Sequence, residues 1–369
     1  MRAGERVPRC RGDDNRRTIT GLAAALAVAV LTTTASAGVA SARLVPDGPV
    51  GPPAYDFASA YSRSLLHPAQ MPPGVNDWSC EPSAEHPNPV VLIHGTWDSA
   101  YGTWPMLAPV LAEEGYCVFA VQYGDEEASW FGNVPGMYGT GDMVVSGDEV
   151  ASFVRRVRDA TGTGKVDLVG HSQGGTMARL VVQDHGGWRP DGGGYVGKVV
   201  GLGANNHGTT LSGIAQLGRT VQDFGVPVLD VAGVPLGRAP IQQAIGDPFF
   251  DRLNAGGETR PGIDYTMITT RYDEIVSPYT SSFLAQGPGA TVHDVVVQDG
   301  CEQDYSEHLS LTYDPRALWY VRAALDPAVS ERETPPCVPV APLGGEVPSG
   351  SVGSAGPAAP AGPQGAGVA

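Results

Sequence analysis

Short runs of hydrophobic residues alternate with helical patterns through the middle of the chain. Residues 89–94 (PVVLIH) and 116–122 (YCVFAVQ) are apolar and rich in β-branched residues, which is typical of strands buried on both faces. A helix is expected around residues 106–114. In residues 150–158 apolar side chains recur every three or four positions, with arginines on the other side. This spacing predicts an amphipathic helix.

The same alternation continues toward the C-terminus. Further strands are predicted at residues 165–170, 196–201, 264–270 and 291–298, and further helices at 173–185 and 315–325. The short turns of antiparallel hairpins are missing between them. The pattern therefore predicts an α/β protein with a mostly parallel central sheet and helices on both faces.

The N-terminal region has the pattern of an export signal. Six arginines precede an apolar run at residues 21–31, and small residues follow it. The run is shorter than the ~20 residues that a membrane-spanning helix needs. We expect a signal peptide over residues 1–37, with cleavage after Ala37 or after Ala42. The Arg16-Arg17 pair leaves both the general and the twin-arginine export route open.

The composition divides the rest of the chain. Residues 343–369 consist almost wholly of Gly, Pro, Ala, Ser and Val, which predicts a disordered tail, and residues 38–54 are expected to form a flexible leader. Residues 55–342 remain as one large domain. The chain of 369 residues is 42% hydrophobic, enough for a sizeable core. Nothing in the sequence indicates the oligomeric state.

The charge narrows the class of partner. The chain has 39 acidic and 23 basic residues, a formal charge of −16, and lysine only at Lys165 and Lys198. Recognition of phosphate backbones needs clustered Lys and Arg. The sequence therefore argues against a nucleic-acid partner.

The strongest chemical signal is GHSQGG at residues 170–175. It fits the G-x-S-x-G pattern, and it follows a predicted strand and precedes a predicted helix. A sharp turn between strand and helix exposes the serine hydroxyl near the helix N-terminus and needs glycines on either side. We predict Ser172 as a nucleophile; the alternative is a tight structural turn.

A second signal follows the first strand. The run LIHGTW at residues 92–97 ends a buried strand in His-Gly, so that a backbone N–H can face a developing oxyanion. We predict the backbone N–H groups of Thr96 and Gln173 as the two donors. His94 is expected to hold the loop rather than to act in catalysis.

The remaining partners follow from chain order. Asp273 comes directly after the strand predicted at 264–270 and is preferred over the adjacent Glu274 as the acid that orients a histidine. Of the eight histidines, His308 alone lies on a loop after the last predicted strand. The order Ser172, Asp273, His308 is that of α/β-hydrolases.

Cysteine usage agrees with export. Cys10 lies in the predicted signal, which leaves Cys80, Cys117, Cys301 and Cys337. Four cysteines outside the cytosol indicate two disulfides and allow three pairings. No two are close enough in sequence to suggest a zinc site, so no metal is expected.

Together these motifs resemble the secreted class 2 triacylglycerol lipases of bacteria and, more distantly, fungal lipases of the B type. The resemblance covers roughly residues 75–342 and rests on VVLIHGTW, GHSQGG, NNHGTTL, YDEIVSPY and EHLSLTYDP, at residues 90–97, 170–175, 205–211, 272–279 and 307–315. It implies the α/β-hydrolase fold, the oxyanion donors Thr96 and Gln173, and no cofactor. It also implies the pairing Cys80–Cys117 and Cys301–Cys337.

The substrate is the part of the function that the sequence determines least. Aromatic residues in 128–143 and apolar residues in 211–263 are expected to form walls or a lid over an acyl pocket, unless they are ordinary core residues. We predict substrate contacts by Trp97, Trp130, Phe131 and Tyr138. The first hypothesis is a secreted lipase that acts on triacylglycerol or other carboxylic esters. An apolar rim around the pocket would favour action at an oil–water interface. A carboxylesterase or polyester hydrolase, an acyltransferase and a non-catalytic binding protein are the alternatives.

Overall fold

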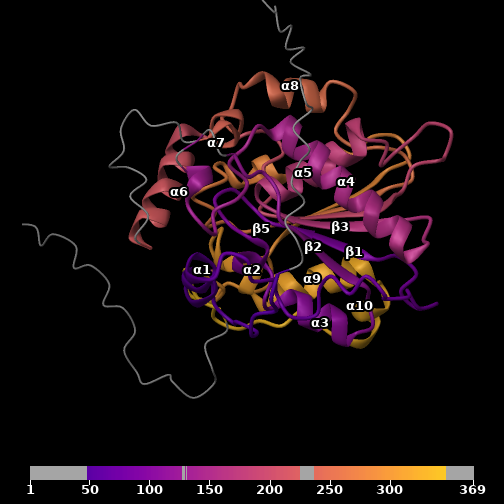
Figure 1. Ribbon diagram of the computed structural model, residues 1–369, viewed down its shortest axis with the longest axis horizontal. Coiled ribbons are helices and arrows are strands. Elements are labelled where there is room, and N and C mark those ends of the chain that lie inside the picture. The colour runs from indigo at the N-terminus through magenta and orange to yellow at the C-terminus, as the bar shows by residue number, and fades with distance from the viewer. Residues whose placement is uncertain (1–47, 127–128, 130, 225–236, 346–369) are drawn as a thin grey trace, which may run out of the picture. The chain divides into compact units, whose positions relative to one another are not determined.

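A computed structural model describes residues 48–126, 129, 131–224 and 237–345 (Figure 1). The predicted signal peptide, most of the predicted leader and nearly all of the predicted tail lie outside these residues. The described α-helices are α1 (Phe57–Leu66), α2 (Ala100–Thr103), α3 (Leu107–Glu113), α4 (Met143–Thr161), α5 (Gln173–Asp184), α6 (Leu211–Asp223), α7 (Arg238–Gln242), α8 (Pro248–Asn254), α9 (Pro315–Leu325) and α10 (Ala328–Arg332).

The described strands form one six-stranded sheet in the order β2-β1-β3-β4-β5-β6, and every neighbouring pair is parallel. The strands are β1 (Val90–Ile93), β2 (Val118–Val121), β3 (Val166–His171), β4 (Val196–Leu202), β5 (Asp264–Thr269) and β6 (Thr291–Val296). Each lies within or close to a predicted run. The predicted α/β fold with a parallel sheet is confirmed.

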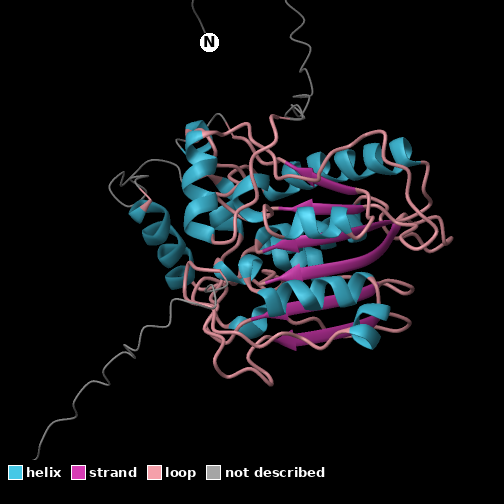
Figure 2. Ribbon diagram, turned by 90° about the horizontal axis from the view of Figure 1, so that it is seen from below, coloured by secondary structure: helices cyan, strands magenta, loops and turns pink. Residues whose placement is uncertain are grey.

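Both faces of the sheet are covered by helices (Figure 2). In β1, Val91 and Ile93 belong to the hydrophobic cluster that includes α4 and α5, whereas Val90 and Leu92 belong to the cluster that includes α3 and α9. Successive side chains of a strand point to opposite faces, and here both faces are apolar. This burial explains why the strands read as continuous hydrophobic runs.

The strand order places a crevice at the ends of β1 and β3. From β1 the chain passes outward to β2 and then returns to β3 on the other side of β1, where Ile93 pairs with both Val121 and Gly170. Loops that leave two neighbouring strands in opposite directions open a gap at their carboxyl ends, the usual ligand position in such sheets. The loop at residues 94–99 and Ser172 both lie there.

A further hydrophobic cluster lies beyond the strand ends rather than on the sheet. Its members come from α1, from α6 and from the loops after β1, β2, β5 and β6. It contains Phe57, Tyr61, Trp97, Phe131, Met137, Leu217, Val221, Ile275, Leu309 and Tyr313. This cluster covers the crevice.

Residues outside the predicted domain boundaries contact the domain. In the predicted leader, Gly51 donates its backbone N–H to the Met71 carbonyl at 2.9 Å. In the predicted tail, the Leu343 carbonyl accepts from Ala58 at 3.3 Å and its N–H donates to Glu307 at 2.9 Å. Residues 48–54 and 343–345 are thus joined to the rest of the fold.

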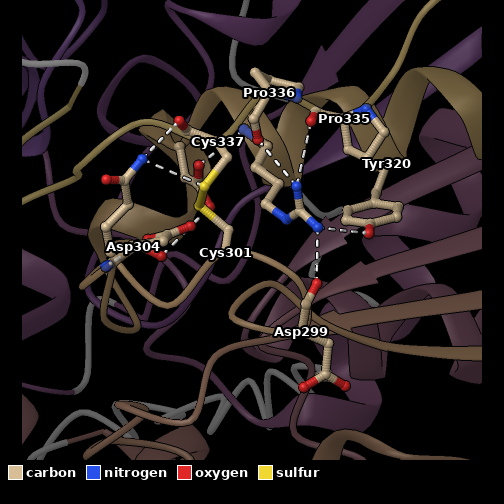
Figure 3. The surroundings of a disulfide bond; sticks show 11 residues. Asp299, Cys301, Asp304, Tyr320, Pro335, Pro336 and Cys337 are labelled. Atoms are coloured by element: carbon tan, nitrogen blue, oxygen red, sulfur yellow. Dashed lines mark hydrogen bonds between the residues drawn. A yellow bond between two sulfur atoms is a disulfide. The ribbon is translucent and has the colours of Figure 1, made fainter.

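The two disulfides have the pairing that the resemblance implies, Cys80–Cys117 and Cys301–Cys337. The second joins the loop after β6 to the C-terminal segment (Figure 3). Beside it the Arg316 guanidinium donates to the carbonyls of Pro336, at 3.1 Å, and Asp299, at 2.7 Å.

In the described ranges, every helix is too short or too polar to cross a membrane.

Candidate active site

Ser172 stands at the turn between β3 and α5 with φ 55° and ψ −123°. A positive φ is uncommon for a residue with a side chain, and here the turn imposes it. A methyl group on Gly170 would lie 2.3 Å from the Gly174 carbonyl carbon, and one on Gly174 would lie 2.1 Å from the Ile93 carbonyl oxygen. The glycines predicted around the serine are therefore required by the close approach of backbone to backbone.

Asp273 is buried directly after β5. Its Oδ1 accepts the backbone N–H groups of Ile275 at 3.1 Å and Val276 at 2.7 Å, and its Oδ2 lies 2.8 Å from His308 Nδ1. These contacts fix the carboxylate and direct one oxygen at the imidazole. Glu274 points elsewhere, since it lines a groove with Tyr272 and Tyr305.

The loop that carries His308 is held by buried side chains on both sides. Glu307 accepts the backbone N–H groups of Leu309 at 2.7 Å and Ser310 at 2.9 Å. His171 Nε2 lies 2.9 Å from the His308 carbonyl oxygen. The imidazole is thus fixed by its own backbone as well as by Asp273.

Electrostatics separate His308 from the other buried histidines. Burial alone would lower the His308 pKa, but the charge and hydrogen bond of Asp273, aided by Glu274 and Glu307, raise it above 6.5. Burial lowers the pKa of His94 to about 4 and that of His171 well below 6.5. His94 and His171 are therefore neutral at physiological pH, and His308 is the ring suited to carry a proton.

Ser172 and His308 line the same cavity. No hydrogen bond among the described residues joins the Ser172 hydroxyl to the His308 ring. Such bonds are often long without substrate and tighten in the substrate complex. Ser172 is only 4% exposed, so a substrate has to displace side chains to reach it.

The loop after β1 is held against the start of α5. The Thr96 hydroxyl accepts from Gln173 Nε2 at 3.2 Å and from Gln243 Nε2 at 2.7 Å. Gln173 is the first residue of α5, and a first-turn N–H has no acceptor within its helix. Both predicted donors, the N–H groups of Thr96 and Gln173, therefore lie on fixed backbone beside Ser172. His94, which is expected to hold this loop, has its Nδ1 2.9 Å from the Gly95 carbonyl.

The space around Ser172 has two arms. The first arm contains His308 and is otherwise mainly apolar, with Phe57, Tyr61, Trp97, Leu217, Val221 and Phe224 in its wall. The second arm contains Asn205, Thr209 and Gln243 together with Ile275 and Val276. Thr96 and Ser172 line both arms. Each has a volume of about 10 Å³, room for about one water molecule.

Sequence reasoning did not assign Asn205, Gln243, Phe57 or Tyr61 to the site. Asn205 lies in the motif NNHGTTL, which could have indicated it. Gln243 follows α7 and reaches Thr96 across 147 residues of sequence, and no local pattern shows such a contact. Phe57 and Tyr61 belong to α1, which precedes the sheet.

The predicted substrate contacts have different positions. Trp97 lines the first arm. Phe131 packs against the Trp97 ring at 5.3 Å and is fully buried, behind the wall rather than in it. Tyr138 donates its hydroxyl to the Pro68 carbonyl at 3.3 Å and is absent from the lining of both arms. Trp130 lies outside the described residues.

Four other residues of the segment 211–263, which was predicted to form part of the wall, fall into two pairs with different positions. Leu217 and Phe224 line the first arm. Phe249 and Phe250, on α8, pack into the cluster on one face of the sheet. The expectation of an active-site wall holds for the former pair, and the latter pair are core residues.

The parallel sheet, its helices on both faces and the serine at the β3–α5 turn are those of an α/β-hydrolase. The profile described as Lipase (class 2) matches residues 87–308. The chain belongs to the class 2 lipase family.

Two solved structures show the extent of the similarity. Lipase B of Aspergillus fumigatus is 18% identical with a TM-score of 0.51, over 69% of this chain and 55% of that one. The chain thus spans little more than half of that protein. Lipase BlEst2 of Bacillus licheniformis in its mature form is 19% identical with a TM-score of 0.40, over 58% of this chain and 85% of that one. At such identities the first likeness shows the fold alone.

Proposed function

We propose that this protein is a secreted serine lipase that cleaves triacylglycerol or other apolar carboxylic esters through Ser172, His308 and Asp273. The observation that carries the proposal is the buried His308–Asp273 pair, 2.8 Å apart, of which His308 lines one cavity with the strained serine. The predicted export signal and the two disulfides support secretion, because disulfides persist in oxidising surroundings.

The chemistry follows from the roles of these groups. His308 removes the proton of the Ser172 hydroxyl as the oxygen attacks the ester carbonyl. The N–H groups of Thr96 and Gln173 stabilise the negative charge on the carbonyl oxygen. His308 then protonates the departing alcohol, and water releases the acyl group by the same steps. Asp273 keeps the Nδ1 proton of His308 in place and stabilises the imidazolium.

The two arms then receive different parts of the ester. The departing alcohol oxygen has to lie beside His308, which lines the first arm. The first arm therefore receives the alcohol part, and the second arm receives the acyl part. Asn205 and Gln243 would contact the acyl side near the carbonyl.

The first test replaces the nucleophile. Ser172→Ala should lower kcat for p-nitrophenyl ester hydrolysis by roughly 10⁴–10⁶-fold, with an unchanged urea unfolding curve as the control for folding. Near-normal hydrolysis by Ser172→Ala would overturn the proposed mechanism.

A second measurement separates lipase from esterase. The narrow arms favour a carboxylesterase on small soluble esters as the second candidate. A p-nitrophenyl series from acetate to palmitate, with and without emulsion, distinguishes them. A lipase should gain activity on long esters when the substrate is emulsified, whereas an esterase should prefer acetate in solution. Offering an alcohol beside water tests acyl transfer.

A further inference from the structure

Helix α1 lies outside the residues that match the family but contributes to the active site. It spans Phe57–Leu66, and the match begins at residue 87. Phe57 and Tyr61 stand one helical turn apart, so that both rings face the same way. Both are buried and line the arm that contains His308. The helix is therefore part of the wall beside the reacting groups.

Three rings form this part of the wall. Phe57 and Tyr61 stack with centroids 5.1 Å apart. Phe224, the residue directly after α6, meets them edge-on at 5.9 Å and 5.1 Å. Such ring pairs contribute more stabilising free energy than the burial of their apolar area alone would give. The contact joins α1 to the residue that follows α6, and all three rings line the arm that contains Ser172.

The ring of Tyr61 has a fixed position relative to the reacting atoms. Its hydroxyl donates to the Trp97 carbonyl at 2.9 Å, and Trp97 follows the predicted oxyanion donor Thr96. The first turn of α1 is also held, because Asp56 caps it through Ser59 N–H at 2.8 Å. The wall is thus built onto the same loop that would hold the oxyanion.

We propose that α1 determines specificity for the alcohol part of the ester, with Phe57, Tyr61 and Phe224 setting the largest alcohol that the arm accepts. This inference rests on the proposed function, since it takes the arm beside His308 as the alcohol site. With a volume of about 10 Å³, the arm admits an alcohol only when the rings separate. Small alcohols require little separation, and bulky ones such as benzyl or cyclohexyl require the contact with Phe224 to open.

The test enlarges the arm and varies one side of the substrate at a time. Phe57→Ala should raise the ratio of kcat/KM for benzyl acetate to that for methyl acetate by at least about tenfold, the size of effect that pocket contacts give. In a series of ethyl esters with acyl chains of increasing length the ratios should stay at wild-type values. Leu66→Ala is the matched control on the same helix, since Leu66 is 77% exposed, and should change neither series.

Two further variants keep the test decisive if Phe57→Ala unfolds. Phe224→Leu shortens the ring from the other side and should shift the alcohol ratio in the same direction. Tyr61→Phe retains all three rings and removes only the bond to Trp97, so its alcohol ratio should equal that of wild type. Urea unfolding establishes that each variant is folded.

The outcomes separate this inference from the proposed function. Unchanged alcohol ratios in folded Phe57→Ala and Phe224→Leu would overturn it, as would a change in the acyl series instead. An equal shift in Tyr61→Phe would show that the rings are not the determinant and would also overturn it. Failure of the proposed function would appear in a different measurement, as esterase activity that survives in Ser172→Ala.

Discussion

The close approach of β1 to the start of α5 predicts that Gly174→Ala lowers both the proposed esterase activity and the stability of this protein. The added methyl group would lie 2.1 Å from the Ile93 carbonyl oxygen, 2.6 Å from that of His94 and 2.7 Å from the Ile93 carbonyl carbon. All three are backbone atoms that lead into the loop of Thr96. Because they belong to a buried strand and its loop, a rotamer change cannot relieve the overlap.

The magnitude follows from the displacement. To restore an ordinary contact, α5 and β1 have to separate by roughly 1 Å, and overpacking of this kind costs about 1–3 kcal/mol of unfolding free energy. The same shift would move Ser172 relative to Thr96. A misplacement of about 1 Å in an active site lowers activity by roughly 10²-fold. We therefore expect a greater effect on kcat/KM than on stability.

The matched control is Gly164→Ala. Gly164 precedes β3, is exposed, and has no atom within 4 Å of the added methyl group. It should leave kcat/KM unchanged and alter stability by no more than about 1 kcal/mol. Urea unfolding and p-nitrophenyl ester kinetics measure both quantities. The reasoning is refuted if Gly174→Ala remains within about threefold of wild-type activity while Gly164→Ala behaves as expected.

Three other predictions concern His308 and the loop that carries it. Because the His308 pKa is raised above 6.5 and the base acts only when neutral, kcat/KM should fall toward acid pH with a midpoint above 6.5. Asp273→Asn should move that midpoint to lower pH and reduce kcat by roughly 10⁴-fold; an unmoved midpoint in a pH–rate profile would contradict this. Glu307→Gln, which replaces one of two acceptor oxygens by a donor, should lower the unfolding free energy by about 1–3 kcal/mol, whereas the exposed Glu302→Gln should have no effect in the same urea titration. Removing the Cys301–Cys337 disulfide, which joins residues 36 apart, should cost about 3–4 kcal/mol, and equal urea midpoints for wild type and a Cys301→Ala/Cys337→Ala variant would count against it.

The sheet was largely predictable because its strands are buried on both faces. A run such as PVVLIH has few other interpretations, and the turn at Ser172 is specified locally by its flanking glycines. Chain order then selected Asp273 and His308, which the fold brings to 2.8 Å. Their catalytic roles stay predictions until the variants are measured.

The substrate side was less predictable because it is made by contacts between distant segments. Phe131 and Phe249 look as suitable for an apolar wall as Leu217 does, yet only Leu217 lines an arm. The difference depends on how loops pack over the strand ends, which periodicity does not encode. The ring of Tyr61 is a further case, since its bond to Trp97 spans 36 residues.

The bonds made by Leu343 have a consequence for trimming of the chain from its C-terminus. Its carbonyl accepts the backbone N–H of Ala58, in the first turn of α1, and its own N–H donates to Glu307, in the loop that carries His308. An exopeptidase that stopped after residue 345 would leave both bonds in place. One that removed Leu343 would take one hydrogen bond from α1 and one from the loop that carries His308, although neither lies near that residue in sequence. Trimming beyond residue 343 therefore weakens two elements of the candidate site at once, whereas trimming that stops at residue 345 leaves both bonds in place.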